Sequence, residues 1–121
     1  MRSKHLLPAL FGFAALGAAA AAASTAPSFT AVVDSSGTLA RGYRALHATR
    51  LGTGRYSVGF GRDVSACSYT ASIGLPGTAG SETPSMVSVA PRTGKPKSLF
   101  VQTFTPDGTR QDHGFHVIVV C

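Results

Sequence analysis

The chain has 121 residues, of which 11 are basic and 5 acidic, and its formal net charge is +6. This length leaves room for one domain. The basic residues are spread along the chain with one short cluster at residues 92–97, which argues against a nucleic-acid-binding protein, since such a protein would carry a tighter basic stripe with interleaved aromatics.

Residues 1–23 are predicted to be a secretory signal peptide. Arg2 and Lys4 form a charged start, residues 6–20 are apolar, and small residues before Ser24 offer a cleavage site after Ala23. Cleavage there would leave nine basic and five acidic residues, a net charge of +4. The alternative is an uncleaved membrane anchor, since the apolar stretch is just long enough to span a bilayer. We therefore expect a secreted or cell-surface protein that meets a membrane only through this segment.

After a short linker at residues 24–28, the first strand is expected at residues 29–33, ended by turn residues at 34–37. Residues 38–42 are predicted to be a bridge rather than a strand. Residues 43–51 favour a strand that leads into a hairpin, although their alanine and leucine content makes a helix the competing interpretation.

The clearest pattern lies at residues 52–74, where two alternating strands are expected at 55–60 and 67–73. In the first, one face carries Tyr56, Val58 and Phe60. In the second, apolar residues alternate with serine and threonine. A period of two is typical of a half-buried sheet.

The second half of the chain continues this pattern. Residues 74–85 are rich in Gly, Pro, Ser and Thr and predict an exposed loop, and residues 91–97 predict a basic loop because two prolines exclude them from a central strand. Strands are expected at residues 86–90, 99–105 and 115–121. The last carries β-branched residues on both faces, so it is predicted to be buried on both sides.

These seven short strands, each followed by turn residues, predict a single-domain, all-β antiparallel sandwich or small barrel at residues 29–121. Helix content is expected to be near zero. No internal repeat, heptad pattern or second domain is found.

Cys67 and Cys121 are the only cysteines. In a small exported domain an even pair predicts a disulfide bond. Both residues lie on the inward parity of their strands, which favours a bond within one chain over a bond between chains. The bond would tie the last residue of the sequence to the middle of the domain.

Several short patterns carry a resemblance to other proteins. They are GTLARG at 37–42, RLGTG at 50–54 before YxVxF at 56–60, VxxCxYxA at 64–71, VxT at 101–103 followed by Asp107 and Asp112, and FHxxVxC at 115–121. The pattern resembles small exported bacterial β-modules that stand alone after a signal peptide or follow collagen-like repeats, and modules at the distal ends of phage tail fibres. The resemblance implies a jelly-roll-like sandwich and, where collagen-like or fibre segments precede it, a homotrimer. It carries over no catalytic residues.

Three histidines follow the signal peptide: His47, His113 and His116. Cleavage of a phosphodiester by a ribonuclease-like mechanism needs two such groups and a cation around one phosphate. His113 and His116 with Arg110 or Lys95 are the set available. We expect surface histidines instead, because His113 lies in a polar connection and His116 on the outward parity of its strand.

The spacing Asp112-His113-x-x-His116 is the one that suggests a metal site. Strand alternation would send the two imidazoles to opposite faces, and no third ligand is evident, so no metal is expected. Asp63 and Asp107 lie in turns, where bonds to the backbone explain them. No cofactor is expected, since no glycine-rich segment leads from a strand into a helix.

These observations predict a non-enzymatic binding or surface-structural module whose loops contact a cell-surface polymer, a glycan or a protein, and not nucleic acid. The candidate binding residues are Arg92, Lys95, Lys97, Arg110 and His113. Two alternatives stay open: a small exported hydrolase or nuclease that uses His113 or His116 with Arg110, and an inhibitor of exported proteases with residues 74–85 as its bait loop.

Overall fold

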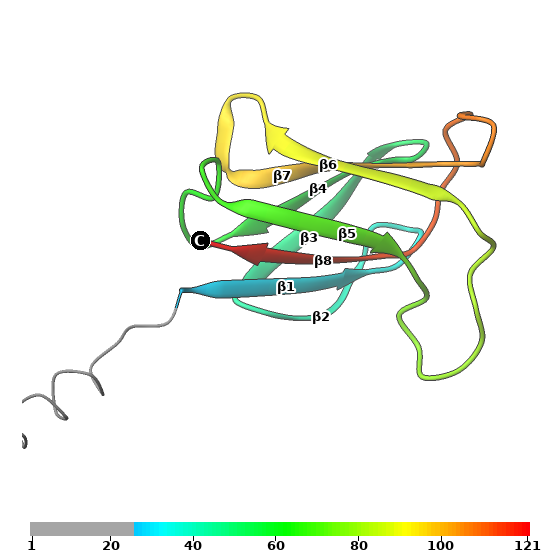
Figure 1. Ribbon diagram of the computed structural model, residues 1–121, viewed down its shortest axis with the longest axis horizontal. Helices are drawn as coiled ribbons and strands as arrows, with labels where there is room; N and C mark the ends of the chain where they lie inside the picture. The colour runs from blue at the N-terminus through cyan, green and yellow to red at the C-terminus, as the bar shows by residue number, and fades with distance from the viewer. Residues whose placement is uncertain (1–25) are drawn as a thin grey trace, which may run out of the picture.

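The structure, a computed structural model, describes residues 26–121, so the predicted signal peptide lies outside the described residues. They form two four-stranded antiparallel sheets packed face to face (Figure 1), which confirms the predicted all-β sandwich. No helix within this range has the length and hydrophobicity needed to cross a membrane. The eight strands are β1 (Ser28–Val33), β2 (Leu39–Tyr43), β3 (Ala45–Gly52), β4 (Arg55–Phe60), β5 (Ser68–Ile73), β6 (Met86–Arg92), β7 (Lys95–Phe104) and β8 (Phe115–Val120).

One sheet has the strand order β2-β1-β8-β5 and the other β3-β4-β7-β6. Within them β1 pairs with β8 and β4 with β7, and β5 lies beside β6 where the edges of the two sheets meet. In the sequence, β5 and β6 lie between β4 and β7, which in turn lie between β1 and β8. This nesting is the arrangement expected of a jelly-roll-like sandwich.

The core lies between the sheets and is built from alternate residues of their central strands. On β4, Tyr56, Val58 and Phe60 are at most 2% exposed, as their spacing predicted. Opposite them β8 contributes Phe115 and its alternate valines. A slip of one residue in either strand would expose this whole set, so burial of one face sets the register.

Strand β8 is buried on one face only, so the prediction that residues 115–121 are covered on both sides is wrong. Phe115, Val117 and Val119 face the core, but Ile118 and Val120 are 48% and 44% exposed on the outer face. The strand is central because β1 and β5 flank it, not because a third layer covers it. β-Branched residues are favoured on any pleated, half-buried surface.

The predicted bridge at residues 38–42 is instead most of strand β2, which pairs with β1. The predicted strand at 43–51 is interrupted at its start, because Arg44 has a φ of 63° and turns the chain from one sheet into the other. The residues of β2 are almost all exposed, so the sequence there has no alternation to reveal a strand.

The predicted basic loop at residues 91–97 is a tight hairpin in which only Thr93 and Gly94 lie outside β6 and β7. Pro91 is tolerated because β6 is an edge strand. Pro96 lies in the part of β7 that extends past β4, whose pairing begins at Ser98. Neither proline therefore lies between two paired strands, as predicted, but both are part of a strand and not of a loop.

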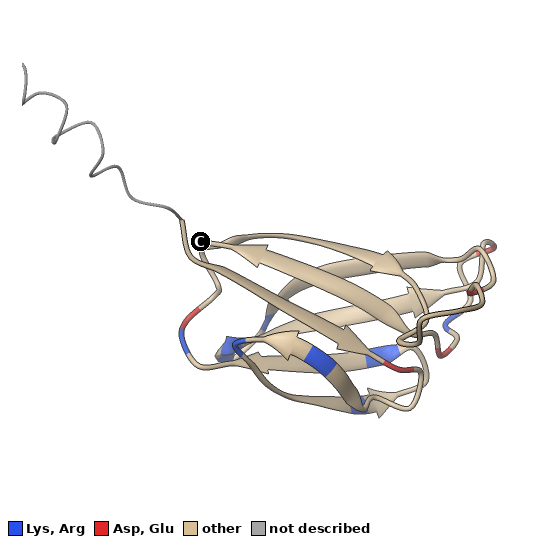
Figure 2. Ribbon diagram, turned by 90° about the horizontal axis from the view of Figure 1, so that it is seen from below, with Lys and Arg blue, Asp and Glu red and all other residues tan. Residues whose placement is uncertain are grey.

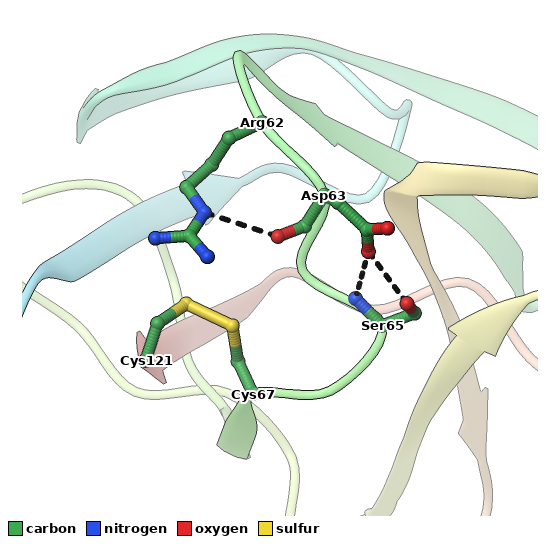
Figure 3. Close-up of a disulfide and its surroundings, with 5 residues drawn as sticks. All are labelled: Arg62, Asp63, Ser65, Cys67 and Cys121. Carbon is green, nitrogen blue, oxygen red and sulfur yellow. Dashed lines mark hydrogen bonds between the residues drawn. A yellow bond between two sulfur atoms is a disulfide. The ribbon is translucent and has the colours of Figure 1, made fainter.

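Cys67 and Cys121 form the predicted disulfide bond, with their Cα atoms 4.5 Å apart (Figure 3). The bond joins the loop before β5 to the residue after β8. Beside it, the backbone N–H of Cys121 donates to the carbonyl oxygen of Pro27 at 2.9 Å. Both ends of the described chain thus lie at the same end of the sandwich, which we call the proximal end.

Candidate functional site

The end of the sandwich opposite the disulfide, here called the distal end, gathers four connections between strands (Figure 1). They are the turns at residues 34–38 and 53–54 and the longer loops at residues 74–85 and 105–114. Four of the five acidic residues lie in them, and Figure 2 shows most of the red segments at this end: Asp34, Glu82, Asp107 and Asp112.

Asp112 ties loop 105–114 to the turn at residues 53–54 and to strand β3. Its Oδ1 accepts the backbone N–H of Gly54 at 2.7 Å, and its Oδ2 accepts Nε of Arg50 at 2.9 Å in an ion pair. Burial raises the pKa of Asp112, but the hydrogen bonds from Gly54 and Arg50 outweigh it, so the pKa lies below the ordinary carboxyl value. The carboxylate therefore stays ionised and holds loop 105–114 against the turn at 53–54.

Tyr56 supports the same region from the core. Its ring is fully buried, and its hydroxyl donates to the carbonyl oxygen of Ser35 at 2.8 Å. Burial, followed by the nearby charge of Asp112, raises the pKa of Tyr56 to about 12. The neutral phenol is thus a permanent donor that fixes the turn at 34–38.

Asp34 and Asp107 each close their own turn. Asp34 accepts the N–H groups of Ser36 and Thr38 at 2.9 Å, and Asp107 accepts the N–H of Thr109 at 3.1 Å. The hydroxyl groups of Ser36 and Thr105 also donate to them and lower both pKa values. At the proximal end the backbone N–H of Ser65 donates to Oδ1 of Asp63 at 2.8 Å, and the hydroxyl group of Ser65 donates to the same oxygen (Figure 3). The predicted roles of Asp63 and Asp107 in turns are confirmed.

His113 is 5% exposed, so the prediction that it is a surface residue is wrong. Its Nε2 lies 2.9 Å from Oε1 of Gln111 and 3.1 Å from Oγ of Ser85, and its Nδ1 lies 3.5 Å from Oε1 of Glu82. Loop 74–85 folds back over His113 and covers it. The one local indication of this contact in the sequence is that Glu82 is the single charged residue of an otherwise neutral loop.

Further contacts hold loop 74–85 against the sheet of β1 and β8. Glu82 accepts the N–H of Gly114 at 3.3 Å, and Nε2 of His116 bonds to the carbonyl oxygen of Leu75 at 3.0 Å. The guanidinium of Arg41 on β2 donates to the carbonyl oxygen of Pro76. The loop is therefore fixed near both of its ends, and its exposed tip is at residues 77–81.

An open groove of about 630 Å³ runs between this loop and the neighbouring edges of β5 and β6. Its lining combines hydroxyl groups and one carboxylate with apolar side chains, and such a mixture of apolar surface with a few polar groups is common in binding sites. The lining includes Ser72, Ile73, Leu75, Glu82, Thr83 and Val87.

Ser85, His113 and Glu82 contact one another in the order of a nucleophile, a base and an acid. Oε1 of Gln111 shares Nε2 of His113 with Oγ of Ser85, at 2.9 and 3.1 Å, so the imidazole does not serve Ser85 alone. The imidazole is also buried. The cluster joins loop 74–85 to loop 105–114.

The five predicted binding residues do not form one surface. Lys95 and Lys97 are exposed beside the proximal turn, and Arg92 donates to Oγ of Ser57 at 2.9 Å on the outer face of its sheet. Arg110 lies at the distal end, and His113 is buried there. The length of the sandwich separates the lysines from the last two.

The residues predicted for an enzymatic site, Arg110, His113 and His116, each have different hydrogen-bond partners. Arg110 donates from Nε and Nη2 to Oε1 of Gln102 at 3.1 and 2.7 Å, whereas His113 and His116 bond to different parts of loop 74–85. Within residues 26–121 no group of three or more His, Cys, Asp or Glu side chains is placed to hold a metal ion.

No protein-family model, no curated protein and no solved structure matches the chain.

Proposed function

We propose that this protein is a non-enzymatic binding module, exported or displayed at the cell surface, and that the distal loops form its contact surface. The observation that carries the proposal is the fixed conformation of loop 74–85. Hydrogen bonds from Arg41 on β2, His113 in loop 105–114 and His116 on β8 fix this loop beside the groove. A surface held in one conformation before binding loses less entropy when a ligand arrives.

The position of this surface supports the same function. Both ends of the described chain leave from the proximal end, so the distal loops face away from any covalent attachment. Loops presented by a rigid sheet scaffold are a common location for binding residues. The disulfide bond is compatible with an extracellular location, because such bonds persist in oxidising compartments.

A cell-surface glycan is the ligand class that best suits the groove. The groove is open rather than enclosed, which suits an extended polymer, and the hydroxyl groups and carboxylate of Ser72, Thr83 and Glu82 can exchange hydrogen bonds with sugar hydroxyls. Leu75 and Val87 offer apolar surface to the faces of sugar rings.

The two alternative functions have less support. A hydrolase would need a free imidazole near a cation, but His113 is buried, Nε2 of His116 is bonded to the carbonyl oxygen of Leu75, and Arg110 is bonded to Gln102. A bait loop needs an exposed segment, which residues 77–81 provide, but no further observation favours this function.

Sedimentation with insoluble cell-wall polysaccharides tests the proposal. Ser81 and Thr83 are exposed and line the groove, so Ser81→Arg with Thr83→Arg should block it without unfolding the protein. Ser88→Arg with Thr93→Arg adds the same charge at exposed positions outside the groove and serves as the control.

We expect the unmodified protein and the control to sediment with at least one polysaccharide, and the groove variant to stay in solution. Equal sedimentation of both variants would place the contact surface elsewhere. If the unmodified protein captures another protein and the groove variant does not, the distal loops are the contact surface but the ligand is a protein and not a glycan.

A further inference from the structure

A second pocket, of about 440 Å³, lies at the proximal end and has no part in the proposed glycan surface. Most of its wall is apolar, and Leu46 is 64% exposed there although it is a large hydrophobic residue. The pocket also contains two arginines. Its lining residues are Pro27, Phe29, Arg44, Leu46, Gly61 and Arg62.

Arg44 occupies an unusual backbone position. Its φ of 63° lies in the left-handed region, where a residue other than glycine is strained, and such strain often accompanies a functional site. Its guanidinium carbon lies 5.6 Å from the ring centre of Phe29 and 4.9 Å from that of Tyr43. These cation–π contacts hold the charge over the apolar wall.

Neither Arg44 nor Arg62 forms an ion pair with an acidic side chain of the described residues. Among residues 26–121 the ion pairs are those of Arg50 with Asp112 and of His113 with Glu82. Arg62 donates from Nε to the backbone carbonyl of Asp63 at 3.0 Å, while the carboxylate of Asp63 is turned towards Ser65 (Figure 3). The pocket therefore combines apolar surface with two arginine side chains that form no ion pair.

We propose that this proximal pocket binds a small apolar carboxylate, with the hydrocarbon part against Phe29 and Leu46 and the carboxylate between Arg44 and Arg62. Guanidinium groups form their strongest hydrogen bonds with such anions. The ligand is either a free fatty acid or the C-terminal residue of a peptide with an apolar side chain, since both present the same chemistry. This site is independent of the distal loops.

Fluorescence of 8-anilinonaphthalene-1-sulfonate, an apolar anion, provides the test on the disulfide-bonded protein. Arg44→Gly removes the guanidinium and leaves glycine at a φ that glycine adopts readily, so the fold should persist. Arg62→Gln removes the second cation, and Leu46→Ser weakens the apolar wall. Lys95→Gln is the control because it removes one charge from an exposed proximal residue outside the pocket.

We expect saturable dye binding to the unmodified protein and to Lys95→Gln, and binding at least about tenfold weaker in each of the other variants. Decanoate or N-acetyl-leucine should displace the dye, and whichever does so identifies the source of the ligand. Decanol, which is equally apolar but uncharged, should not.

Three results would overturn the proposal. They are the absence of saturable dye binding, equal binding by Arg44→Gly, Arg62→Gln and the control, and displacement by decanol or by neither carboxylate.

Discussion

Asp112 illustrates how a single residue organises the distal end. Its carboxylate accepts hydrogen bonds from Gly54 and Arg50, and its charge also contributes to the raised pKa of Tyr56. The ion pair with Arg50 and the effect on Tyr56 require the ionised form, which also strengthens the hydrogen bond from Gly54. Its identity matters because asparagine would keep the shape and one acceptor oxygen but lose the charge.

We predict that Asp112→Asn lowers the free energy of unfolding by about 1–2 kcal/mol at neutral pH, since it weakens charge-assisted hydrogen bonds. Because the pKa of Asp112 is depressed in the folded state, this stabilisation is present above the ordinary carboxyl pKa of 3.8 and is lost as the pH falls through the lower, folded value. Urea unfolding from pH 7 to pH 2 checks this.

The two proteins should therefore differ at pH 7 and converge in strong acid. The unmodified protein should also lose stability below about pH 4, because the pKa values of Asp34, Asp63 and Asp107 are lowered too. A difference between variant and unmodified protein that stays constant over the whole range would show that the charge of Asp112 is not responsible.

At the scale of elements, two hairpin turns place glycine in the left-handed region in very different surroundings. Gly54, with a φ of 62°, joins β3 to β4 at the crowded distal end, where an added Cβ would lie 2.5 Å from the carbonyl oxygen of Thr103 and 2.9 Å from the backbone nitrogen of Gln111. Gly94, with a φ of 75°, joins β6 to β7 and has nothing within 4 Å of that position. A substitution at Gly94 therefore tests backbone strain alone, whereas the same substitution at Gly54 tests strain and steric crowding together.

We predict that Gly94→Ala lowers the free energy of unfolding by about 1–2 kcal/mol, the cost of a left-handed backbone conformation alone. Gly54→Ala carries that cost and also forces backbone atoms apart, so its loss should be larger by a further ~1–3 kcal/mol. Urea unfolding of both variants measures the difference. Equal losses would mean that loop 105–114 yields freely and is not held as the hydrogen bonds of Asp112 indicate.

At the scale of the whole molecule, the disulfide bond and the burial of alternate residues act together. The bond between Cys67 and Cys121 spans 54 residues and links the last residue of the sequence to the loop before β5. It therefore closes a loop that contains β5, β6, β7 and β8. Restriction of the unfolded chain is the main way such a bond stabilises a small domain.

We predict that replacing both cysteines by alanine lowers the free energy of unfolding by about 4 kcal/mol, the value that the chain-entropy relation assigns to a loop of this length. Urea unfolding of the double variant measures it, and the reduced unmodified protein is the matched comparison. A loss below about 1 kcal/mol in both would show that the sheets alone restrain the chain.

The amino-acid sequence predicts the structure of some segments well and of others poorly. The alternation at residues 55–60 predicted the buried face of β4, since side chains of a strand point to opposite sides whatever the strand pairs with. The two cysteines predicted their bond for a similarly simple reason, because each had one partner available. Strand β2 was missed because its exposed residues do not alternate.

The candidate sites depended on contacts between distant segments. Charge and loop composition grouped Lys95 and Lys97 with Arg110 and His113, but the direction of β7 carries the lysines to the proximal end and the other two to the distal end. His113 was expected at the surface because its neighbours in the sequence are polar. Only the return of loop 74–85 buries it.

Three local features could be predicted from residue order alone: the β class, the inward face of β4 and the disulfide partners. These follow from alternation and residue type, which act between near neighbours or within a single pair. The packing of the two sheets establishes which loops share an end, which histidine is buried and where Arg44 and Arg62 lie beside apolar surface. Strand order and loop return set these features, and both arise from contacts between residues far apart in the chain.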